Sequence, residues 1–425
     1  MFRLTPNRVL ATVGAAALAA GGLLASMGGS AQASTTTALS SNWYAAAPYL
    51  MPLDNNPPNP TDVMAATGLK AFQLAFILAP NGGGCTPTWG GTAAVSSDTS
   101  VAATIASIRA AGGDVSVSIG GYGGTKLGQT CSTPAATAAA YQQVIDKYGL
   151  HAMDFDLEEP EYENTAAVAN EIGAAQILQQ NNPGLYISVT TPGTTSGTGW
   201  FGQQMLNQAK TDGFTPNNFS IMPFDGGFNG AASQISALQQ FNTMLMNTFG
   251  WSSATAYAHE GISMMNGRSD SGEYFYQSDF QTVLNFAESN HMARYTFWSI
   301  NRDRQCTPAD NNGQTSGICS SVPQNSWDFT KYDVQFAGAT PPTGTPSASA
   351  SASASASASA SPSASASSSP TSGGGTCTAA AWSSTTAYNG GAVVSYNGHQ
   401  WTAKWWTEAD TPGGAAGVWT DNGPC

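Results

Sequence analysis

Charged residues and metal-binding side chains are scarce in this sequence. Lys, Arg, Asp and Glu make up 9% of the 425 residues, and 26 acidic residues stand against 13 basic ones. The formal net charge of −13 argues against nucleic acid and anionic membranes as partners. The four histidines are scattered without ligand spacing, and no two cysteines form a Cys-x-x-Cys pair. We therefore expect neither a metal site nor a cofactor.

Long apolar runs are also nearly absent. The exception is residues 9–27, which are apolar but rich in Ala and Gly. Arg3 and Arg8 precede this run, and the small-residue site Ala31-Gln32-Ala33 follows it, which is the pattern of a secretory signal peptide. We expect residues 1–33 to be removed and the protein to be secreted to the extracellular space; a membrane anchor is the alternative interpretation.

The cysteine count fits such an exported protein. The sequence has six cysteines, and an even number in an exported chain suggests three disulfides. Six cysteines allow 15 connectivities, of which nearest-neighbour pairing is the simplest. That pairing would join Cys85 to Cys131, Cys306 to Cys319 and Cys377 to Cys425.

A low-complexity segment divides the rest of the chain. Residues 340–376 consist of Ser, Ala, Pro, Thr and Gly and include no large apolar side chain. Such a composition cannot bury a core, so we expect a disordered linker there. Residues 34–339 and 377–425 are then two separate domains.

The larger domain alternates β-rich apolar runs with helix-like stretches. The spacing of eight such runs predicts an α/β fold, the (β/α)8 TIM barrel, with a doubly wound sheet as the competitor. We expect the small C-terminal domain to be all-β. The predicted strands are 43–50, 69–78, 115–121, 151–158, 185–192, 218–225, 259–265 and 294–300, and the clearest helices are 100–111, 135–148, 164–180, 232–249 and 278–289.

The fourth predicted strand ends in an unusual acidic run, Asp-Phe-Asp-Leu-Glu-Glu-Pro. Alternate residues of a strand face the same side, so Asp154, Asp156 and Glu158 should lie close together, with Glu159 structural on the opposite face. Like charges at close range disfavour full ionisation, so at least one proton should be shared or retained. Barrel active sites lie at the carboxyl ends of the strands, which favours Glu158 as the acid nearest the cleft.

Three other interpretations of the acidic run compete. An EF-hand calcium loop fails because Glu159 and Thr165 stand where that loop needs Gly and Glu. A metal-binding Asp-x-Asp of a sugar transferase fits poorly with export. A solvated acidic strand end is the third interpretation. Hydrolysis of a glycosidic bond, in contrast, requires a carboxylic acid that keeps its proton near neutral pH beside a second carboxylate. Glu158 is the natural proton donor, with Asp156 as its neighbour and Asp154 behind to share or tune the proton on Asp156.

Three motifs together resemble glycoside hydrolase family 18, the retaining chitinases. The family's Asp-x-x-Asp-x-Asp-x-Glu signature matches at Asp154, Asp156 and Glu158, with His151 in place of the first Asp. Its Ser-x-Gly-Gly signature matches residues 118–121 on the preceding strand, and Trp298 stands where the family has the tryptophan beneath the sugar. A plain core role for Trp298 is the alternative.

The resemblance implies a mechanism and a set of substrate contacts. The 2-acetamido oxygen of the substrate attacks the anomeric carbon, Glu158 protonates the leaving oxygen and Asp156 holds the acetamido N–H. The family's Tyr on strand six is replaced by Phe224, which cannot donate a hydrogen bond and leaves the acetamido donor unidentified. The predicted catalytic residues are Glu158, Asp156 and Asp154, and the predicted substrate-binding residues are Trp298, Met222, Asp225 and Tyr49.

The C-terminal domain is rich in aromatic residues, including five tryptophans between Cys377 and Cys425. This segment resembles the small chitin-binding modules of carbohydrate-binding families 5 and 12, whose Ala-x-Trp-Trp step matches residues 403–406. The resemblance implies that Trp405 and Trp406 bind chitin. Trp382 is assigned either to binding or to the core, and Tyr388, Tyr396 and Trp401 are assigned to the core.

The sequence thus predicts a secreted, monomeric chitinase that acts on chitin and chito-oligosaccharides. Two alternatives stay open. One is a non-catalytic chitin-binding lectin built on the barrel, which Phe224 and His151 favour. The other is an endo-β-N-acetylglucosaminidase.

Overall fold

The fold is described from a computed structural model. The chain divides into two compact units, Met1–Pro346 and Ser347–Cys425. The predicted signal peptide over residues 1–33 and the predicted linker over residues 340–376 lie outside the described residues. The structure describes residues 38–338, 377, 379–384, 386, 388, 392–403, 411–414 and 418–425.

Within residues 38–338, eight parallel strands form a curled sheet. Neighbouring strands pair in chain order from β1 to β12, and Thr296 Oγ1 of β12 donates to the Ala47 oxygen just before β1 at 2.7 Å, which joins the two ends. The predicted barrel architecture is confirmed. The strands are β1 (Tyr49–Leu50), β2 (Ala71–Leu78), β5 (Asp114–Gly120), β6 (Ala152–Asp156), β7 (Tyr186–Pro192), β8 (Asn218–Met222), β9 (Glu260–Met265) and β12 (Arg294–Trp298).

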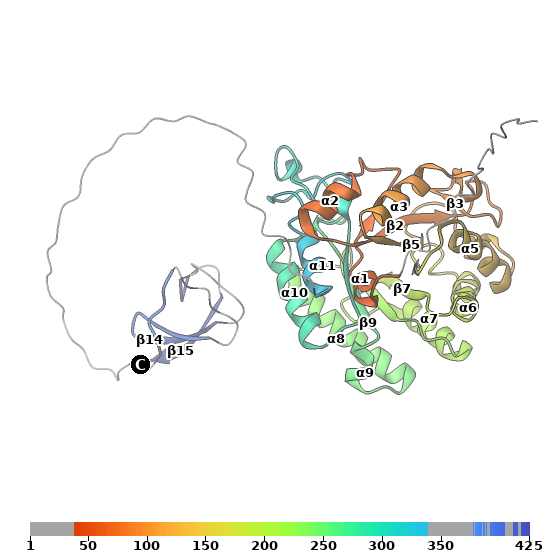
Figure 1. Ribbon diagram of the computed structural model, residues 1–425. Helices are drawn as coiled ribbons and strands as arrows, with labels where there is room; N and C mark the ends of the chain where they lie inside the picture. Colours follow the sequence, from red (N-terminus) through yellow and green to blue (C-terminus); the bar gives the residue numbers. More distant parts are fainter. Residues whose placement is uncertain are drawn as a thin grey trace, which may run out of the picture. The chain divides into compact units, whose positions relative to one another are not determined.

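One main helix follows each of these strands, and the helices surround the sheet (Figure 1). They are α2 (Pro60–Thr67), α3 (Ser100–Ala110), α5 (Pro134–Tyr148), α6 (Thr165–Asn181), α7 (Gly199–Asp212), α8 (Gly230–Phe249), α10 (Gln277–Ser289) and α11 (Thr330–Phe336). Shorter elements are α1 (Ser41–Ala45), α4 (Leu127–Thr130), α9 (Ser253–Tyr257), η1 (Val95–Ser97), η2 (Ile300–Arg302) and η3 (Asn311–Gly313).

Local sequence fixes the helix ends. At the start of α5 the Thr133 side chain accepts a hydrogen bond from the Ala136 N–H, and Pro134 occupies the first helical position, where no N–H is needed. Gly149 ends the same helix in the left-handed conformation, with φ of 56°. This turn delivers the chain directly to β6, the strand that carries the acidic run.

The prediction of a strand over residues 43–50 is mostly wrong. Residues Ser41–Ala45 form the helical turn α1, and only Tyr49 and Leu50 pair as a strand with β2. Trp43 and Tyr44 are buried, and Tyr44 Oη donates to Asp114 Oδ2 at 2.6 Å. The apolar character of this segment therefore reflects packing at the amino end of the barrel rather than a long strand.

Small hairpins and disulfides shape the loops that follow the strands. β3 (Thr88–Trp89) and β4 (Ala93–Ala94) follow β2, and β10 (Gly267–Arg268) and β11 (Tyr274–Phe275) follow β9. Two disulfides, Cys85–Cys131 and Cys306–Cys319, tie together loops on the carboxyl side of the strands. Both match the predicted pairing.

The second unit contains a three-stranded antiparallel sheet of β13 (Val393–Tyr396), β14 (His399–Ala403) and β15 (Trp419–Pro424). The Cys377–Cys425 disulfide closes it, as predicted. Trp382, Tyr388 and Trp401 pack partly buried against its small core, so Trp382 contributes to packing. Trp405 and Trp406, the predicted chitin-binding residues, lie outside the described residues.

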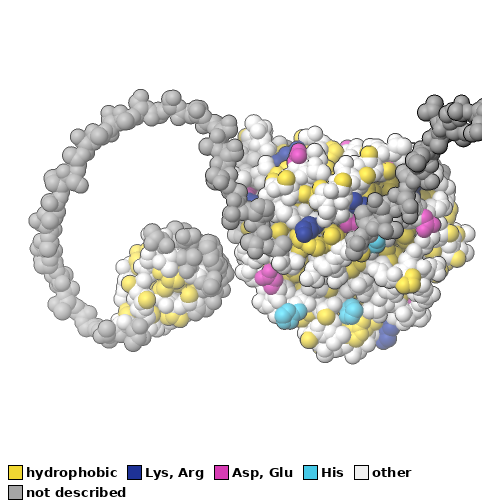
Figure 2. All heavy atoms as spheres, in the orientation of Figure 1, with side chains coloured by type: hydrophobic (Ala, Val, Ile, Leu, Met, Phe, Trp, Pro, Cys, Tyr) yellow, Lys and Arg dark blue, Asp and Glu magenta, His cyan; other side chains and the backbone are white. Residues whose placement is uncertain are grey.

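The surface carries few charges. Figure 2 shows charged side chains mostly singly on the face that it presents, in keeping with the 9% charged content of the chain. No helix in the described part of the chain combines the length and apolarity needed to cross a bilayer.

Candidate active site

A cleft of about 1130 Å³ lies among the carboxyl ends of the strands and the loops that follow them. Its size suits several sugar units, because pockets for drug-sized ligands span roughly 300–1,000 Å³. The cleft brings together residues that are far apart in the sequence and that sequence analysis assigned to the site. These are Tyr49, Asp156, Glu158, Met222, Asp225 and Trp298.

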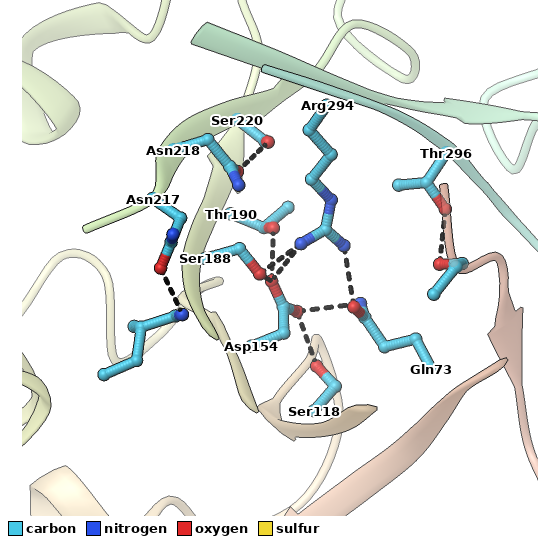
Figure 3. Close-up of polar contacts among 12 residues, drawn as sticks. Gln73, Ser118, Asp154, Ser188, Thr190, Asn217, Asn218, Ser220, Arg294 and Thr296 are labelled. Carbon is cyan, nitrogen blue, oxygen red and sulfur yellow. Dashed lines mark hydrogen bonds and ion pairs between the residues drawn. The ribbon is translucent and has the colours of Figure 1, made fainter. Parts of the chain in front are cut away.

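Asp154 lies beneath the cleft and is fully buried at the centre of a polar network (Figure 3). Arg294 Nη1, also fully buried, forms an ion pair with Asp154 Oδ1 at 3.0 Å. Every other donor to this carboxylate comes from an inward-facing side chain of the barrel. They are Tyr49 Oη at 3.0 Å, Gln73 Nε2 at 2.9 Å and Ser118 Oγ at 2.8 Å to Oδ2, and Ser188 Oγ at 2.6 Å and Thr190 Oγ1 at 2.8 Å to Oδ1.

This network separates the two predicted roles of Asp154, which were to share or to tune the proton on Asp156. Both oxygens of Asp154 accept hydrogen bonds from donors elsewhere in the barrel, which favours tuning over sharing. Six donors, one of them a guanidinium, stabilise a carboxylate rather than a carboxylic acid. Asp154 therefore presents a fixed negative charge beneath Asp156, and this charge raises the pKa of Asp156.

Asp156 ends β6 and is 2% exposed at the floor of the cleft. Burial raises the pKa of Asp156 well above its usual range, and the negative charges of Glu158 and Asp154 raise it further. Lys126 and Arg294 oppose this rise. Asp156 Oδ1 has no hydrogen-bond partner among the described residues, so it is free to accept a hydrogen bond from a ligand.

Glu158 lies in the loop after β6, partly exposed on the cleft wall. The pKa of Glu158 is raised to about 7, and burial is the largest cause. The charges of Glu159, Asp225 and Asp270 add to this rise, whereas Lys126 opposes it. The pKa of Glu158 is about 7 and the charge of Glu158 raises the pKa of Asp156, so these two carboxyl groups together retain a proton close to neutral pH. A carboxylic acid of this kind can donate a proton and later accept one.

Strand alternation predicted that Glu159 lies on the opposite face, and this prediction is wrong. Because β6 ends at Asp156, alternation no longer applies after that residue, and Glu159 also borders the cleft. Its charge contributes to the raised pKa of Glu158.

Trp298 forms an aromatic floor with two neighbours. Its ring stacks on Phe76, with centroids 5.6 Å apart and planes at 13°, and meets Tyr49 edge-on at 5.7 Å. Sequence analysis missed Phe76, because the register of β2 against β5 shifts between Leu74 and Ile77 and simple alternation does not apply there. It also missed Tyr122, which borders the cleft with 74% of its surface exposed. The flanking glycines of the segment Gly-Gly-Tyr-Gly-Gly were the available signal for an exposed loop aromatic.

Asp225 connects the loop after β8 to the hairpin after β9. Asp225 Oδ1 accepts hydrogen bonds from the Ser271 N–H at 2.6 Å and from Ser271 Oγ at 2.8 Å. The Glu273 carboxylate in turn accepts hydrogen bonds from the backbone N–H groups of Asp225, Gly227 and Phe228 at 2.6–2.7 Å. These bonds fix one wall of the cleft.

Close packing explains the first glycine of the Ser-x-Gly-Gly segment. Gly120 has φ of 92°, and a Cβ atom there would overlap the backbone oxygen of Asp156. The glycine thus lets β5 approach β6 closely at Asp156. Lys126, which is buried, donates to the backbone oxygens of Gly120 at 3.2 Å, of Gly123 at 2.6 Å and of Gly121.

His151 lies at the other end of β6, away from the cleft. Its Nδ1 pairs with Asp114 Oδ2 at 2.8 Å, and Arg109 Nε donates to Asp114 Oδ1 at 2.8 Å. Burial tends to raise the pKa of Asp114, but hydrogen bonds from Tyr44, His151 and Arg109 lower it overall. The residue that differs from the motif resembled on this strand therefore lies at the amino end of the barrel, away from the cleft.

The described residues contain no cluster of three or more His, Cys, Asp or Glu side chains arranged to hold a metal ion. The arrangement at the cleft is instead one of acids on an aromatic floor. Sugar rings have apolar faces and many hydroxyl groups, and both features match such a surface.

Comparison with known proteins agrees with this geometry. Residues 381–420 match the model of carbohydrate-binding module family 5/12. The chain is 28% identical over 275 residues to the probable bifunctional chitinase/lysozyme of Escherichia coli (strain K12), covering 60% of this chain and 30% of that protein. It is 27% identical over 282 residues to endochitinase 11 of Metarhizium anisopliae, covering 60% and 52%. The chain thus spans about a third and about half of the length of these curated relatives.

Among solved structures, the chain is similar to the catalytic domain of a hyperthermophilic chitinase from Pyrococcus furiosus. The TM-score is 0.61 at 24% identity, and the match covers 68% of this chain and 93% of that domain. At 24% identity this likeness concerns the fold, which in this chain is a (β/α)8 barrel. The curated relatives that the barrel resembles are named as chitinases, and the C-terminal residues 381–420 resemble carbohydrate-binding module family 5/12.

Proposed function

We propose that the protein is a secreted chitinase that hydrolyses β-1,4 bonds between N-acetylglucosamine units with retention of configuration. The observation that carries this proposal is Glu158, a cleft carboxyl group whose pKa is raised to about 7 beside the buried Asp156. The chitinase names of its relatives support the substrate class. The three disulfides, with the predicted signal peptide, support an oxidising, extracellular location.

In this mechanism the protein supplies acid, orientation and a binding surface, and the substrate supplies the nucleophile. A sugar ring stacks on Trp298, and Asp156 Oδ1 accepts the N–H of its 2-acetamido group. The acetamido oxygen attacks the anomeric carbon while Glu158 gives its proton to the leaving oxygen. Glu158 then takes a proton from a water molecule while the water oxygen attacks the anomeric carbon. This attack opens the oxazolinium-like intermediate, and the proton transfer restores the acid form of Glu158.

Two other functions compete with this one. A chitin-binding lectin would need the cleft and its aromatic floor but not an acid with a raised pKa, so Glu158 argues against it. An endo-β-N-acetylglucosaminidase would use the same acids. The carbohydrate-binding module, which suits a polymer surface, favours chitin over the glycans of single proteins.

The deciding experiment compares the parent protein with Glu158→Gln on colloidal chitin. We expect release of reducing ends to fall by about 10³-fold or more, because proton donation to the leaving oxygen is lost. Chitin binding should be unchanged. Glu163→Gln is the matched control, since Glu163 is exposed in the same loop and does not border the cleft. Residual activity of Glu158→Gln within tenfold of the parent would rule out Glu158 as the acid.

Retention is tested separately by proton NMR of the first products. We expect mainly the β-anomer, because attack by the acetamido oxygen and then by water inverts the anomeric carbon twice. A predominance of the α-anomer in the earliest spectra would show single displacement and contradict the proposed mechanism.

A further inference from the structure

Two buried polar atoms at the cleft have no hydrogen-bond partner among the described residues. They are Asp156 Oδ1 and Ser263 Oγ. Asp156 is 2% exposed and Ser263 is fully buried. Buried polar groups in native proteins are nearly always paired, because an unpaired one costs stability. The proposed mechanism uses Asp156 but leaves the Ser263 hydroxyl without a role.

Ser263 lies on β9 with its side chain on the cleft side of the strand. Ser263 and Met265 border the cleft, whereas the intervening Met264 packs in the core. Ile262 pairs with Ile221 of β8, so Ser263 lies beside Met222 at the end of that strand. β7 and β8 separate β9 from β6, so Ser263 and Asp156 project toward the barrel axis from different sides.

Two other hydroxyl groups of the cleft already have partners. Tyr49 Oη donates to Asp154 at 3.0 Å, and Ser271 Oγ donates to Asp225 at 2.8 Å. Phe224, which also borders the cleft, has no hydroxyl group. Of the buried hydroxyls that border the cleft, Ser263 alone is left unpaired within the described part of the chain.

A secondary amide requires one acceptor for its N–H and at least one donor for its oxygen. The cleft floor leaves one carboxylate acceptor and one hydroxyl donor unpaired, which is the set that an amide satisfies. A sugar with only hydroxyl groups would not require this division between an acceptor and a donor.

We propose that Ser263 is a substrate-binding residue that donates a hydrogen bond to the carbonyl oxygen of the sugar's 2-acetamido group, while Asp156 accepts the N–H. This assignment rests on the proposed function. It makes Ser263 a specificity-determining residue for N-acetylated sugars, and it places the donor on β9 rather than on β8.

The test uses the full-length protein and two soluble tetramers, so that only the cleft is measured. The N-acetylglucosamine tetramer is the substrate, and its kcat/KM is determined. The fully deacetylated glucosamine tetramer serves as a competitive inhibitor, and its inhibition constant is determined. For Ser263→Ala we expect kcat/KM to fall about three- to tenfold, the effect of one neutral hydrogen bond. The inhibition constant should not change, because that tetramer has no amide.

Ser220→Ala is the matched control. Ser220 is a buried barrel serine on β8 whose hydroxyl already donates to Asn218 Oδ1 at 2.8 Å and does not border the cleft. Its replacement should lower the Tm and leave kcat/KM within about twofold of the parent. Ser263→Ala should leave the Tm unchanged or higher, because it removes an unpaired buried hydroxyl.

Each result decides the question. A kcat/KM for Ser263→Ala within about twofold of the parent would overturn the assignment. The assignment would also be overturned if Ser263→Ala lowered the Tm and weakened inhibition by the deacetylated tetramer as much as it lowered kcat/KM for the acetylated one. The hydroxyl group would then have a structural role. If the parent itself fails to hydrolyse the acetylated tetramer, the proposed function falls, and this inference falls with it. If the parent is active and Ser263→Ala is unaffected, only this inference falls.

Discussion

Replacing Glu158 by Gln should make the stability of the barrel less dependent on pH. In the folded protein burial raises the pKa of Glu158 from its usual 4.5 to about 7. The folded state therefore binds this proton more tightly than the unfolded state does. The contribution of the protonated Glu158 side chain to stability is fully present below pH 4.5 and is lost as the pH rises through 7.

The size of the effect follows from the shift. Each pKa unit corresponds to about 1.36 kcal/mol, so a shift of roughly 2.5 units gives about 3 kcal/mol between pH 4 and pH 8. Glutamine does not titrate, so the variant lacks this loss. The Glu158 charge also raises the pKa of Asp156, so its removal further lowers the cost of ionising Asp156 at high pH.

Urea denaturation at pH 4.5, 6 and 8, followed by tryptophan fluorescence, measures this difference. We expect the free energy of unfolding of the parent to fall by about 2–3 kcal/mol more than that of Glu158→Gln across this range. Glu163→Gln should behave like the parent, because Glu163 is exposed. Parallel pH profiles for the parent and Glu158→Gln would refute the idea that burial of Glu158 costs stability.

Two further predictions concern the buried ion pair and the second unit. Arg294→Met should cost about 3–5 kcal/mol of unfolding free energy by urea denaturation, because it leaves Asp154 charged and buried without its cation; a loss below about 1 kcal/mol would show that the neutral donors suffice. Deleting residues 341–425 should lower activity on insoluble chitin severalfold but barely alter it on a soluble tetramer, because the module raises the barrel's effective concentration at a surface. Replacing Trp405 and Trp406 by Ala in the full-length protein should have the same effect, and equal losses on both substrates would show instead that the module supports the barrel.

The alternation of strands and helices was predictable because every barrel strand except the first overlaps one predicted β-rich run almost entirely. The segment 43–50 misled the prediction because its apolar residues pack in two different ways. Trp43 and Tyr44 form a helical turn at the amino end, and only Tyr49 and Leu50 enter the sheet. Composition alone cannot separate these two kinds of burial.

The acidic residues of the candidate site were predictable as a group, but the contacts around them were not. Strand alternation correctly placed Asp154 and Asp156 on one face. The sequence could not show that Arg294, 140 residues away, pairs with Asp154, because that contact depends on the closing strand of the barrel. Glu159 was misplaced because the end of β6 at Asp156 depends on pairing with its neighbours, and Ser263 carried no local signal at all.

The polar interior of the barrel also affects how stability depends on temperature. TIM barrels are typically filled by Val, Ile and Leu, whereas this one buries Gln73, Ser118, Asp154, Ser188 and Arg294. Exposure of apolar surface on unfolding increases the heat capacity, whereas exposure of polar surface decreases it. Unfolding of this barrel should therefore have a smaller heat-capacity change per residue than unfolding of an apolar-filled one. Its stability curve is correspondingly flatter, so the free energy of unfolding declines more gradually on either side of its maximum.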